Sequence, residues 1–365
     1  KATNVPYTTY LKNLEKYNKD LSQMQEKLLK EAGDYTKTRY SIVSLSIQKL
    51  IDTHKDFADL LLFISLLDSQ SIPRDLLQKY KNNLVVDQFI HALKKYSLIT
   101  NEISLNKELA ISIHRSTQAI SLSYLSNILK IQNNKKLIYN IAIIIEKHMG
   151  YLIDKEDLAQ LKAFVGHCET FLSHSTMLTN TIGSELGIIY FYLNKFNKAK
   201  NVLEKSIESM KNYCNKFPAK ASQAFLHLGI VNREQGNYEQ AKVFIDKSLE
   251  ICINYISSPH INEVWALAHL GIIHRDLGNY NKSKELLEKS LSVYKDISKK
   301  NTTDSAWIMA LLGTVYTKLG QYEQAKSLFE KSLKIYKNNF GNKHHKTAWV
   351  LGNIGIIYKE QKKYE

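Results

Sequence analysis

Five glycines recur at a constant spacing in the second half of this 365-residue chain. They lie 42 residues apart, and an aromatic residue keeps the same step. The glycines are Gly187, Gly229, Gly271, Gly313 and Gly355, and the aromatic residues are Phe196, Tyr238, Tyr280, Tyr322 and Tyr364. A fixed period of about 20 to 50 residues is typical of a solenoid, in which each unit buries its apolar surface only against its neighbours. The second half of the chain is therefore predicted to be a stacked array of helical hairpins.

Other positions in each unit follow the same period. A Leu or Ile precedes the glycine, and farther on a small residue stands four positions before a large apolar one. These pairs are Ala199 and Leu203, Ala241 and Ile245, Ser283 and Leu287, and Ala325 and Phe329. The pattern resembles the tetratricopeptide repeat, with a step longer than the usual length of about 34 residues. The resemblance implies a mostly α-helical protein in which residues 182–365 form a right-handed superhelix of about four and a half helix–turn–helix repeats.

The 42-residue step is similar to that of the kinesin light chain branch of this family. The segment 340–348, Phe-Gly-Asn-Lys-His-His-Lys-Thr-Ala, resembles the linker of that branch, with His345 in place of its proline. The paired asparagines of the branch are mostly absent, and only Asn353 matches. The resemblance therefore implies the fold and does not imply the acidic, tryptophan-containing peptides that such proteins bind.

The three tryptophans of the chain also keep the 42-residue step. At about 100° per residue, Trp265 and Ile272 share one stripe of the first helix of their hairpin, and we expect this stripe to face the groove of the superhelix. Repeated aromatic residues beside cations suit a peptide-binding trough. The candidate partner-binding residues are Trp265, Trp307, Trp349, Ile230, Ile272, Arg233, Arg275 and Lys318. The alternative is that the three indoles only stack between adjacent first helices, and both interpretations stay open.

Residues 40–130 show a different pattern. We expect helices over 58–67, from the Ser-Ile-Pro at 71–73 onward, and over 86–96, followed by strands over 97–100 and 109–114 around a turn at Asn106. Three helices followed by a small hairpin are typical of a winged helix. The strings Leu-Leu-Leu-Phe-Ile-Ser-Leu-Leu-Asp at 60–68 and Ile-His-Arg-Ser-Thr-Gln at 113–118 resemble the winged-helix module of NB-ARC (STAND) ATPases.

In that family a histidine at the end of this strand contacts the β-phosphate of bound ADP, and the matching residue is His114. An imidazole can donate a hydrogen bond to a phosphate oxygen. The alternative is a structural histidine that caps the end of the strand. Residues 1–39 resemble the end of a preceding helical subdomain, and residues 131–181 are predicted to be a helical connector. Lys1 and Glu365 are the ends of the sequence, and we expect both to be cuts in a longer protein.

Composition narrows the class of protein. The net charge of +15 is compatible with nucleic-acid binding, but the third predicted helix of the winged-helix module offers only Lys94 and Lys95 and no arginine to read bases. The three cysteines have no CxxC spacing, which argues against a zinc site and favours a reducing, cytoplasmic compartment. The longest apolar run, residues 141–145, is too short to span a bilayer.

Catalytic motifs are missing from the sequence. The string His-Arg-Asp-Leu at 274–277 matches a kinase catalytic loop in letters, but it lies at the turn of a repeat and no phosphate-binding loop accompanies it. The pair His344 and His345 lacks further ligands at metal-binding spacing. We therefore expect no enzyme activity, no metal and no cofactor in this chain, with ADP or ATP entering only through a nucleotide-binding domain upstream.

These observations favour a non-enzymatic protein–protein interaction module. By resemblance it is the regulatory and sensor half of a STAND (NB-ARC–TPR) ATPase whose groove recognises a protein or peptide. One alternative is a stand-alone adaptor or secreted bacterial effector that binds a host protein. The other is a nucleic-acid-binding winged-helix regulator, and oligomerisation stays open in all three cases.

Overall fold

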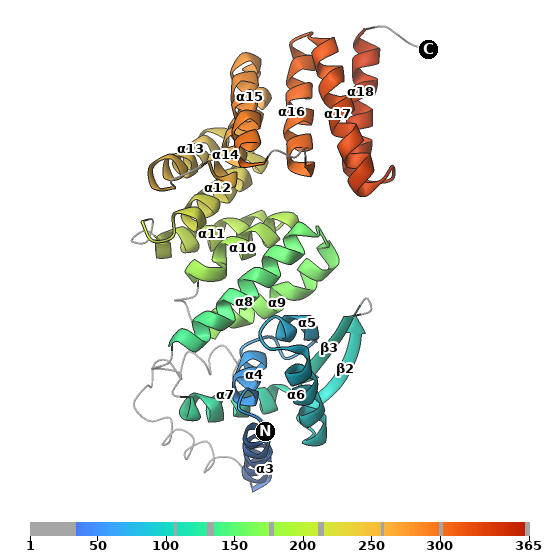
Figure 1. Cartoon of the computed structure of the whole chain (residues 1–365). Coiled ribbons are helices and arrows are strands. Elements are labelled where there is room, and N and C mark those ends of the chain that lie inside the picture. The colour runs from blue at the N-terminus through green and yellow to red at the C-terminus, as the bar shows by residue number, and fades with distance from the viewer. Residues whose placement is uncertain are drawn as a thin grey trace. The chain divides into compact units, whose positions relative to one another are not determined.

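The computed structural model describes residues 34–105, 108–129, 135–174, 179–210, 215–256, 259–298 and 302–361 (Figure 1). The chain divides into two compact units, residues 1–193 and 194–365. Both units are built mainly from α-helices, which confirms the predicted fold class. No helix within these described ranges is long and apolar enough to cross a membrane.

The first unit begins with a small helical module that carries one sheet. Its elements are α3 (Asp34–Thr53), α4 (Phe57–Ser65), β1 (Ile72–Pro73), α5 (Arg74–Gln78), α6 (Asn83–Lys95), β2 (Ile99–Leu105), β3 (Glu108–Ile113) and α7 (Arg115–Ile128). The three strands are antiparallel in the order β1-β3-β2. Helices α4 and α6 share a core in which the rings of Phe57 and Phe89 lie 5.3 Å apart, edge to face. The helices expected over 58–67 and 86–96 are present as α4 and α6, and the expected hairpin is present as β2 and β3. The resemblance to a winged helix stays a prediction.

Two details of this module differ from the prediction. The helix expected from 71–73 onward is present as α5 and begins at Arg74, because Ile72 and Pro73 pair with Ile111 and Ala110 as strand β1. Pro73 then caps α5 from an extended conformation with ψ 130°, a geometry that the fixed φ of proline allows. The first strand of the hairpin starts later and is longer than expected, because it runs over Ile99–Leu105. The expected turn at Asn106 and residues 1–33 lie outside the described residues.

Three further helices complete the first unit. They are α8 (Lys135–Asp154), α9 (Leu158–His174) and α10 (Thr179–Tyr192), and they pack on one another. The phenol of Tyr190 on α10 donates a hydrogen bond to a carboxylate oxygen of Glu169 on α9. Helix α10 carries Gly187 of the 42-residue pattern, so the first repeat begins within this unit.

The second unit consists of regularly alternating helices. They are α11 (Phe196–Met210), α12 (Pro218–Glu234), α13 (Tyr238–Tyr255), α14 (Ile261–Asp276), α15 (Tyr280–Ile297), α16 (Thr303–Lys318), α17 (Tyr322–Phe340) and α18 (His345–Glu360). We call α12, α14, α16 and α18 the A helices and α11, α13, α15 and α17 the B helices. Helices α12, α14 and α16 pack most extensively on the B helix that follows each of them, and all four A helices contact the B helix before them.

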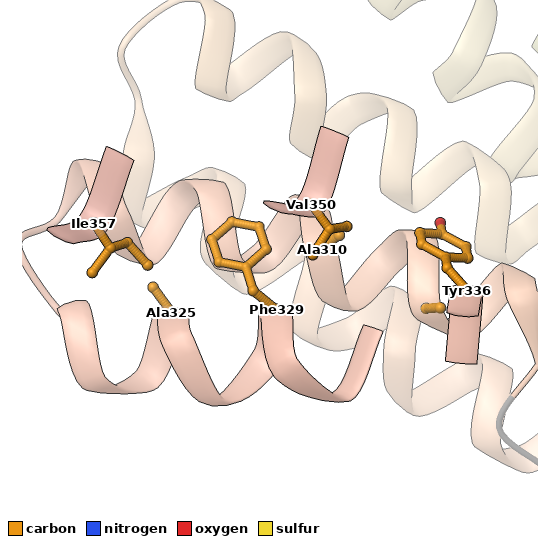
Figure 2. Packing of buried hydrophobic residues seen from close by; sticks show 7 residues of the cluster. Ala310, Ala325, Phe329, Tyr336, Val350 and Ile357 are labelled. Atoms are coloured by element: carbon orange, nitrogen blue, oxygen red, sulfur yellow. The ribbon is translucent and has the colours of Figure 1, made fainter. Parts of the chain in front are cut away.

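The periodic glycines bring the two helices of a hairpin together. A Cβ atom added at Gly313 would come within 2.9 Å of the Phe329 ring, and one added at Gly271 within 2.8 Å of Leu287 Cγ. Only glycine allows this approach, and the large apolar residue of helix B takes the space. Figure 2 shows the resulting cluster, in which Phe329 and Tyr336 of α17 pack with residues of α16 and α18.

The turn from helix A to helix B is also periodic. Gly236, Gly278 and Gly320 have positive φ angles of 79°, 79° and 73°, and Asn194 takes the same place with φ 55°. After Gly278, the amide of Asn279 donates to the carbonyl of His274 at 2.8 Å, which closes the end of α14. Glycine and asparagine tolerate this left-handed conformation. The His-Arg-Asp-Leu string thus forms the end of α14 and its turn.

A row of buried serines, which the sequence analysis did not single out, links the helices of each hairpin. Ser248, Ser290 and Ser332 are completely buried on successive B helices. Each hydroxyl donates a hydrogen bond of 2.8 Å to a carbonyl oxygen of the preceding A helix. Because a buried hydroxyl without a partner is costly, these bonds fix the register between helices A and B.

Contacts between successive repeats pair a charged residue with a ring. The Nζ atom of Lys284 on α15 lies 5.1 Å from the ring centroid of Tyr316 on α16, and Lys326 lies at the same distance from Tyr358 one repeat later. The phenol of Tyr316 also donates to Glu288 at 2.8 Å. The tyrosines at this register therefore join α16 and α18 to the B helix before each of them.

Candidate partner-binding surface

The A helices contact one another in succession along the second unit. We call the surface that they form the A-helix face. The candidate residues Trp265, Trp307 and Trp349 occupy the same position on α14, α16 and α18. Their common 42-residue register therefore places all three indoles on elements of this one face.

Two of the three indoles pack against each other. The ring centroids of Trp265 and Trp307 lie 5.2 Å apart with an interplanar angle of 62°, an edge-to-face contact between α14 and α16. The imidazole of His269 on α14 makes a second ring contact with Trp307, with the ring centroids 5.5 Å apart. Both indoles are half-buried. The two indoles therefore contribute to the packing of α14 against α16.

The third indole is more open. Trp349 lies on α18, the last helix that the structure describes, and no following A helix covers it. It is 40% exposed, and Ile356 on the same helix is 48% exposed. An exposed Trp of this kind offers a large, rigid contact area at a low cost in conformational entropy. Among the described residues of the A-helix face, Trp349 is the indole most accessible to a partner.

The two isoleucines are placed differently from the prediction. Ile230 is 6% exposed and Ile272 is 4% exposed, so both lie in the core and do not line an open groove. Ile272 packs in one cluster with Leu287 of its own hairpin and Leu311 of the next A helix. The reason is that an A helix is covered by the neighbouring A helix as well as by its own B helix.

The cationic candidates fall into two groups. Arg275 forms an ion pair with Asp276 at 2.8 Å and lies 3.4 Å from the hydroxyl of Thr314 on the next A helix. Arg233 makes the equivalent contacts one repeat earlier, with Glu234 and, at 3.4 Å, with Nδ1 of His269. Lys318, at the end of α16, is exposed. The arginines are thus held between A helices, whereas Lys318 extends from the surface.

Two histidines belong to the same face and were not among the candidate residues. His227 and His269 occupy equivalent positions on α12 and α14, 42 residues apart. Burial lowers the pKa of His227 to about 4, and burial together with the nearby Arg233 lowers the pKa of His269 well below its usual value. Both imidazoles are therefore neutral near pH 7. Their 42-residue spacing, the same as that of the glycines, is the sequence signal that could have identified these two histidines as residues of this face.

His114 lies at the start of α7 in the first unit. It is the N-cap residue of that helix, and its Nδ1 atom accepts a hydrogen bond from the amide of Ser116 at 3.2 Å. His114 therefore caps the start of helix α7, whereas the structural interpretation expected a cap on the end of the strand. The side chain is exposed, and contact with a nucleotide phosphate stays a prediction.

Helix α6, the third helix of the predicted winged helix, offers few groups that suit base recognition. The exposed residues of α6 include Leu84, Asp87 and His91 beside Lys94 and Lys95. Asp87 forms an ion pair with Arg74. A carboxylate and an apolar side chain on this surface oppose close approach to a phosphate backbone, which attracts cations.

Comparison with known proteins agrees with the periodicity of the second unit. Residues 220–296 and 304–365 match the tetratricopeptide repeat family, and residues 185–212 match a second tetratricopeptide repeat description. No curated protein sequence matches the chain.

Several solved structures resemble the chain in fold. BtubC from P. vanneervenii is 14% identical, with a TM-score of 0.47 and coverage of 60% of this chain and 87% of that one. A STAND protein with a tetratricopeptide repeat sensor from Pyrococcus horikoshii is 16% identical, with a TM-score of 0.44 and coverage of 86% and 55%. A kinesin light chain candidate from Podosopora anserina with nearly identical TPR-like repeats is 15% identical, with a TM-score of 0.42 and coverage of 51% and 89%.

At these identities the likeness concerns the fold alone. The family matches start in α10 and continue through α18, and they coincide with the periodic glycines, turns and hairpins described above. Residues 185–212, 220–296 and 304–365 are therefore tetratricopeptide repeats, and the second compact unit of this chain is a tetratricopeptide repeat array.

Proposed function

We propose that the chain is a non-enzymatic interaction module whose A-helix face binds a protein or peptide partner. The observation that carries the proposal is the common register of Trp265, Trp307 and Trp349 on successive A helices. Trp265 and Trp307 are half-buried and packed on each other, and Trp349, on the last described helix, is 40% exposed. Because Trp is enriched among the residues that dominate binding energy at interfaces, an exposed Trp on a regular face suits such a role.

The packing of the array supports this role in a second way. The Gly–Phe and Gly–Leu contacts inside hairpins and the Lys–Tyr contacts between repeats fix the A helices relative to their neighbours. A surface that is already ordered loses little conformational entropy when a partner binds. The affinity then depends on a few exposed side chains, here Trp349 and Lys318.

A finer proposal concerns the larger protein in which this module works. We propose that it is the regulatory and sensor half of a STAND-type ATPase, in which the repeats recognise the partner and the winged-helix module holds a nucleotide-binding domain closed. The order of a winged-helix arrangement before tetratricopeptide repeats supports this, as does His114 at the end of β3. The residues encoded upstream of Lys1 test it. A Gly-x4-Gly-Lys-Ser/Thr motif would support the ATPase, and an upstream sequence without a nucleotide-binding motif would instead favour a stand-alone adaptor or effector.

Site-specific photo-crosslinking tests the proposed surface. One variant of the 365-residue chain carries a photo-reactive amino acid in place of Lys318 on α16, and a matched variant carries it in place of Lys289, which is exposed on B helix α15. We expect one defined protein to crosslink from position 318 and not from position 289. Equal crosslinking from both positions, or crosslinking from position 289 alone, would contradict binding at the A-helix face.

A further inference from the structure

The first unit contains a cleft that the repeat array does not explain. It has a volume of about 210 Å³ and lies between the sheet and helices α8 and α9. Pro73 and Ala110 of the sheet, Leu152 of α8 and Phe164 of α9 supply much of its apolar lining. Its rim includes the exposed residue Ala163 of α9. The cleft is therefore reachable from solvent while its floor is buried.

Three aromatic rings form one wall of the cleft. The ring of Phe164 lies 4.7 Å from the imidazole of His148 and 5.5 Å from that of His167. All three side chains are nearly fully buried, with 2% to 3% exposure. Aromatic rings pack well against the edges and faces of other rings. A planar aromatic molecule therefore fits this wall better than a flexible aliphatic one.

His167 is one of the lining residues, and one of its ring nitrogens has no hydrogen-bond partner among the described residues. Its Nε2 atom lies 3.3 Å from the carbonyl oxygen of Ser71, which makes Nε2 the donor of this bond. Burial lowers the pKa of His167, so the ring is neutral and its Nδ1 atom keeps a lone pair. Among the described residues, Nδ1 is buried without a hydrogen-bond partner. A buried acceptor of this kind is costly unless a donor reaches it.

The partner of His167 is held in an unusual conformation. Ser71 lines the cleft and has φ 54°, a left-handed conformation uncommon for a residue with a side chain. Its amide donates to the hydroxyl of Ser112 at 3.0 Å, so the strand beside it fixes this geometry. Such outliers persist where the surroundings impose them, and they are frequent at ligand-binding sites.

The charged groups near the cleft lie outside its lining. Lys79 Nζ lies 2.6 Å from Nδ1 of His148, and a carboxylate oxygen of Asp75 lies 3.6 Å from the same lysine. Burial lowers the pKa of His148 to about 4, so this imidazole is also neutral near pH 7. The residues that line the cleft are therefore all uncharged near pH 7. An uncharged ligand fits it best.

We propose that this cleft binds a small uncharged aromatic molecule of one or two rings that carries a single N–H or O–H donor. The rings contact Phe164 and the two imidazoles, and the donor reaches Nδ1 of His167. A cavity of about 150 Å³ is sufficient for benzene, so the volume here admits a molecule of the size of indole. This site is separate from the proposed partner-binding role of the repeats.

Titration of the 365-residue chain with indole, followed by ligand-observed NMR, tests the proposal. We expect saturable binding, with Ala163→Phe weakening it at least tenfold because the new ring fills the cleft from its rim. Lys162→Phe is the matched control, because it adds the same ring at an exposed neighbouring residue that does not line the cleft. The melting temperature and helicity of both variants establish that they fold.

Indene, which has the shape of indole without the N–H group, tests the role of His167 in the unmodified chain. We expect indene to bind at least fivefold more weakly than indole. Three results would overturn the proposal: no saturable binding of indole to the unmodified chain, equal binding by the two phenylalanine variants, or equal affinity for indole and indene.

Discussion

The indole of Trp307 on α16 lies edge-to-face against the indole of Trp265 on α14, with the ring centroids 5.2 Å apart. This contact joins two consecutive repeats through their A helices. It separates the three tryptophans into a packed pair and the more exposed Trp349. The same residue type at the same register therefore has different consequences for stability and for binding.

Truncation of the packed pair should destabilise the array. We expect Trp307→Ala to lower the free energy of unfolding by about 2 to 3 kcal/mol, because it removes a half-buried indole and an aromatic contact. Trp349→Ala should cost less than about 1 kcal/mol, since that side chain is 40% exposed. Urea denaturation followed by circular dichroism measures both values. Equal losses would mean that the exposed indole also serves packing.

Substitution by alanine should change stability differently at two of the periodic glycines, Gly313 and Gly355. Gly313→Ala places a Cβ atom within 2.9 Å of Phe329, and we expect a loss of about 1 to 3 kcal/mol despite the better helix propensity of alanine. At Gly355 no atom lies within 4 Å of the new Cβ, so Gly355→Ala in the 365-residue chain should be neutral or stabilising by up to about 1 kcal/mol. Thermal unfolding compares the two variants. Destabilisation of similar size at both positions would refute the close-packing explanation.

The buried serines should contribute through their hydrogen bonds. We expect Ser290→Ala to cost about 1 kcal/mol, since its hydroxyl bonds the carbonyl of Val264 at 2.8 Å in a fully buried site. Ser292→Ala on the same helix is the control, because Ser292 is exposed and should change stability little. Chemical denaturation of both variants measures the difference. A Ser290→Ala protein as stable as the control variant would show that the bond has no net effect.

Acid should destabilise the folded chain through its buried histidines. Burial lowers the pKa of His148, His174 and His227 to about 4, whereas an unfolded histidine titrates near 6.5. Between these values the unfolded chain binds more protons, so the free energy of unfolding must fall as the pH falls from about 6.5 to about 4.

Denaturation at a series of pH values measures this slope. We expect His174→Leu to flatten it, because His174 has a buried Nε2 atom without a partner among the described residues and an apolar side chain can replace it. A stability that stays constant across this range, or a slope unchanged in the variant, would contradict the burial of neutral imidazoles.

The repeat array was predictable because each periodic residue meets one local structural requirement. Gly313 must allow the approach of Phe329, and Gly278 must adopt a positive φ, so the sequence alone indicates hairpins and their turns. The two-residue strand β1 was not predictable, because Ile72 and Pro73 join a strand that lies far along the chain. Their local pattern instead indicates the start of a helix.

The candidate surface was predictable only in part, because helical periodicity describes one helix and not its neighbours. The register of the tryptophans could be read directly, but the burial of Ile272 depends on Leu311 of the next A helix. The cleft near His167 was not predictable from the sequence for the same reason. It combines residues of the sheet, α8 and α9, and no spacing in the sequence connects them.

Binding of a purified partner to two matched variants tests the central claim most directly. Once crosslinking from position 318 has identified the partner, isothermal titration calorimetry compares Trp349→Ala on the A-helix face with Lys289→Ala on helix α15. We predict that Trp349→Ala raises the dissociation constant about thirtyfold, which corresponds to about 2 kcal/mol, while Lys289→Ala leaves it unchanged. An unchanged dissociation constant for Trp349→Ala, or an equal loss in both variants, would contradict recognition at the A-helix face.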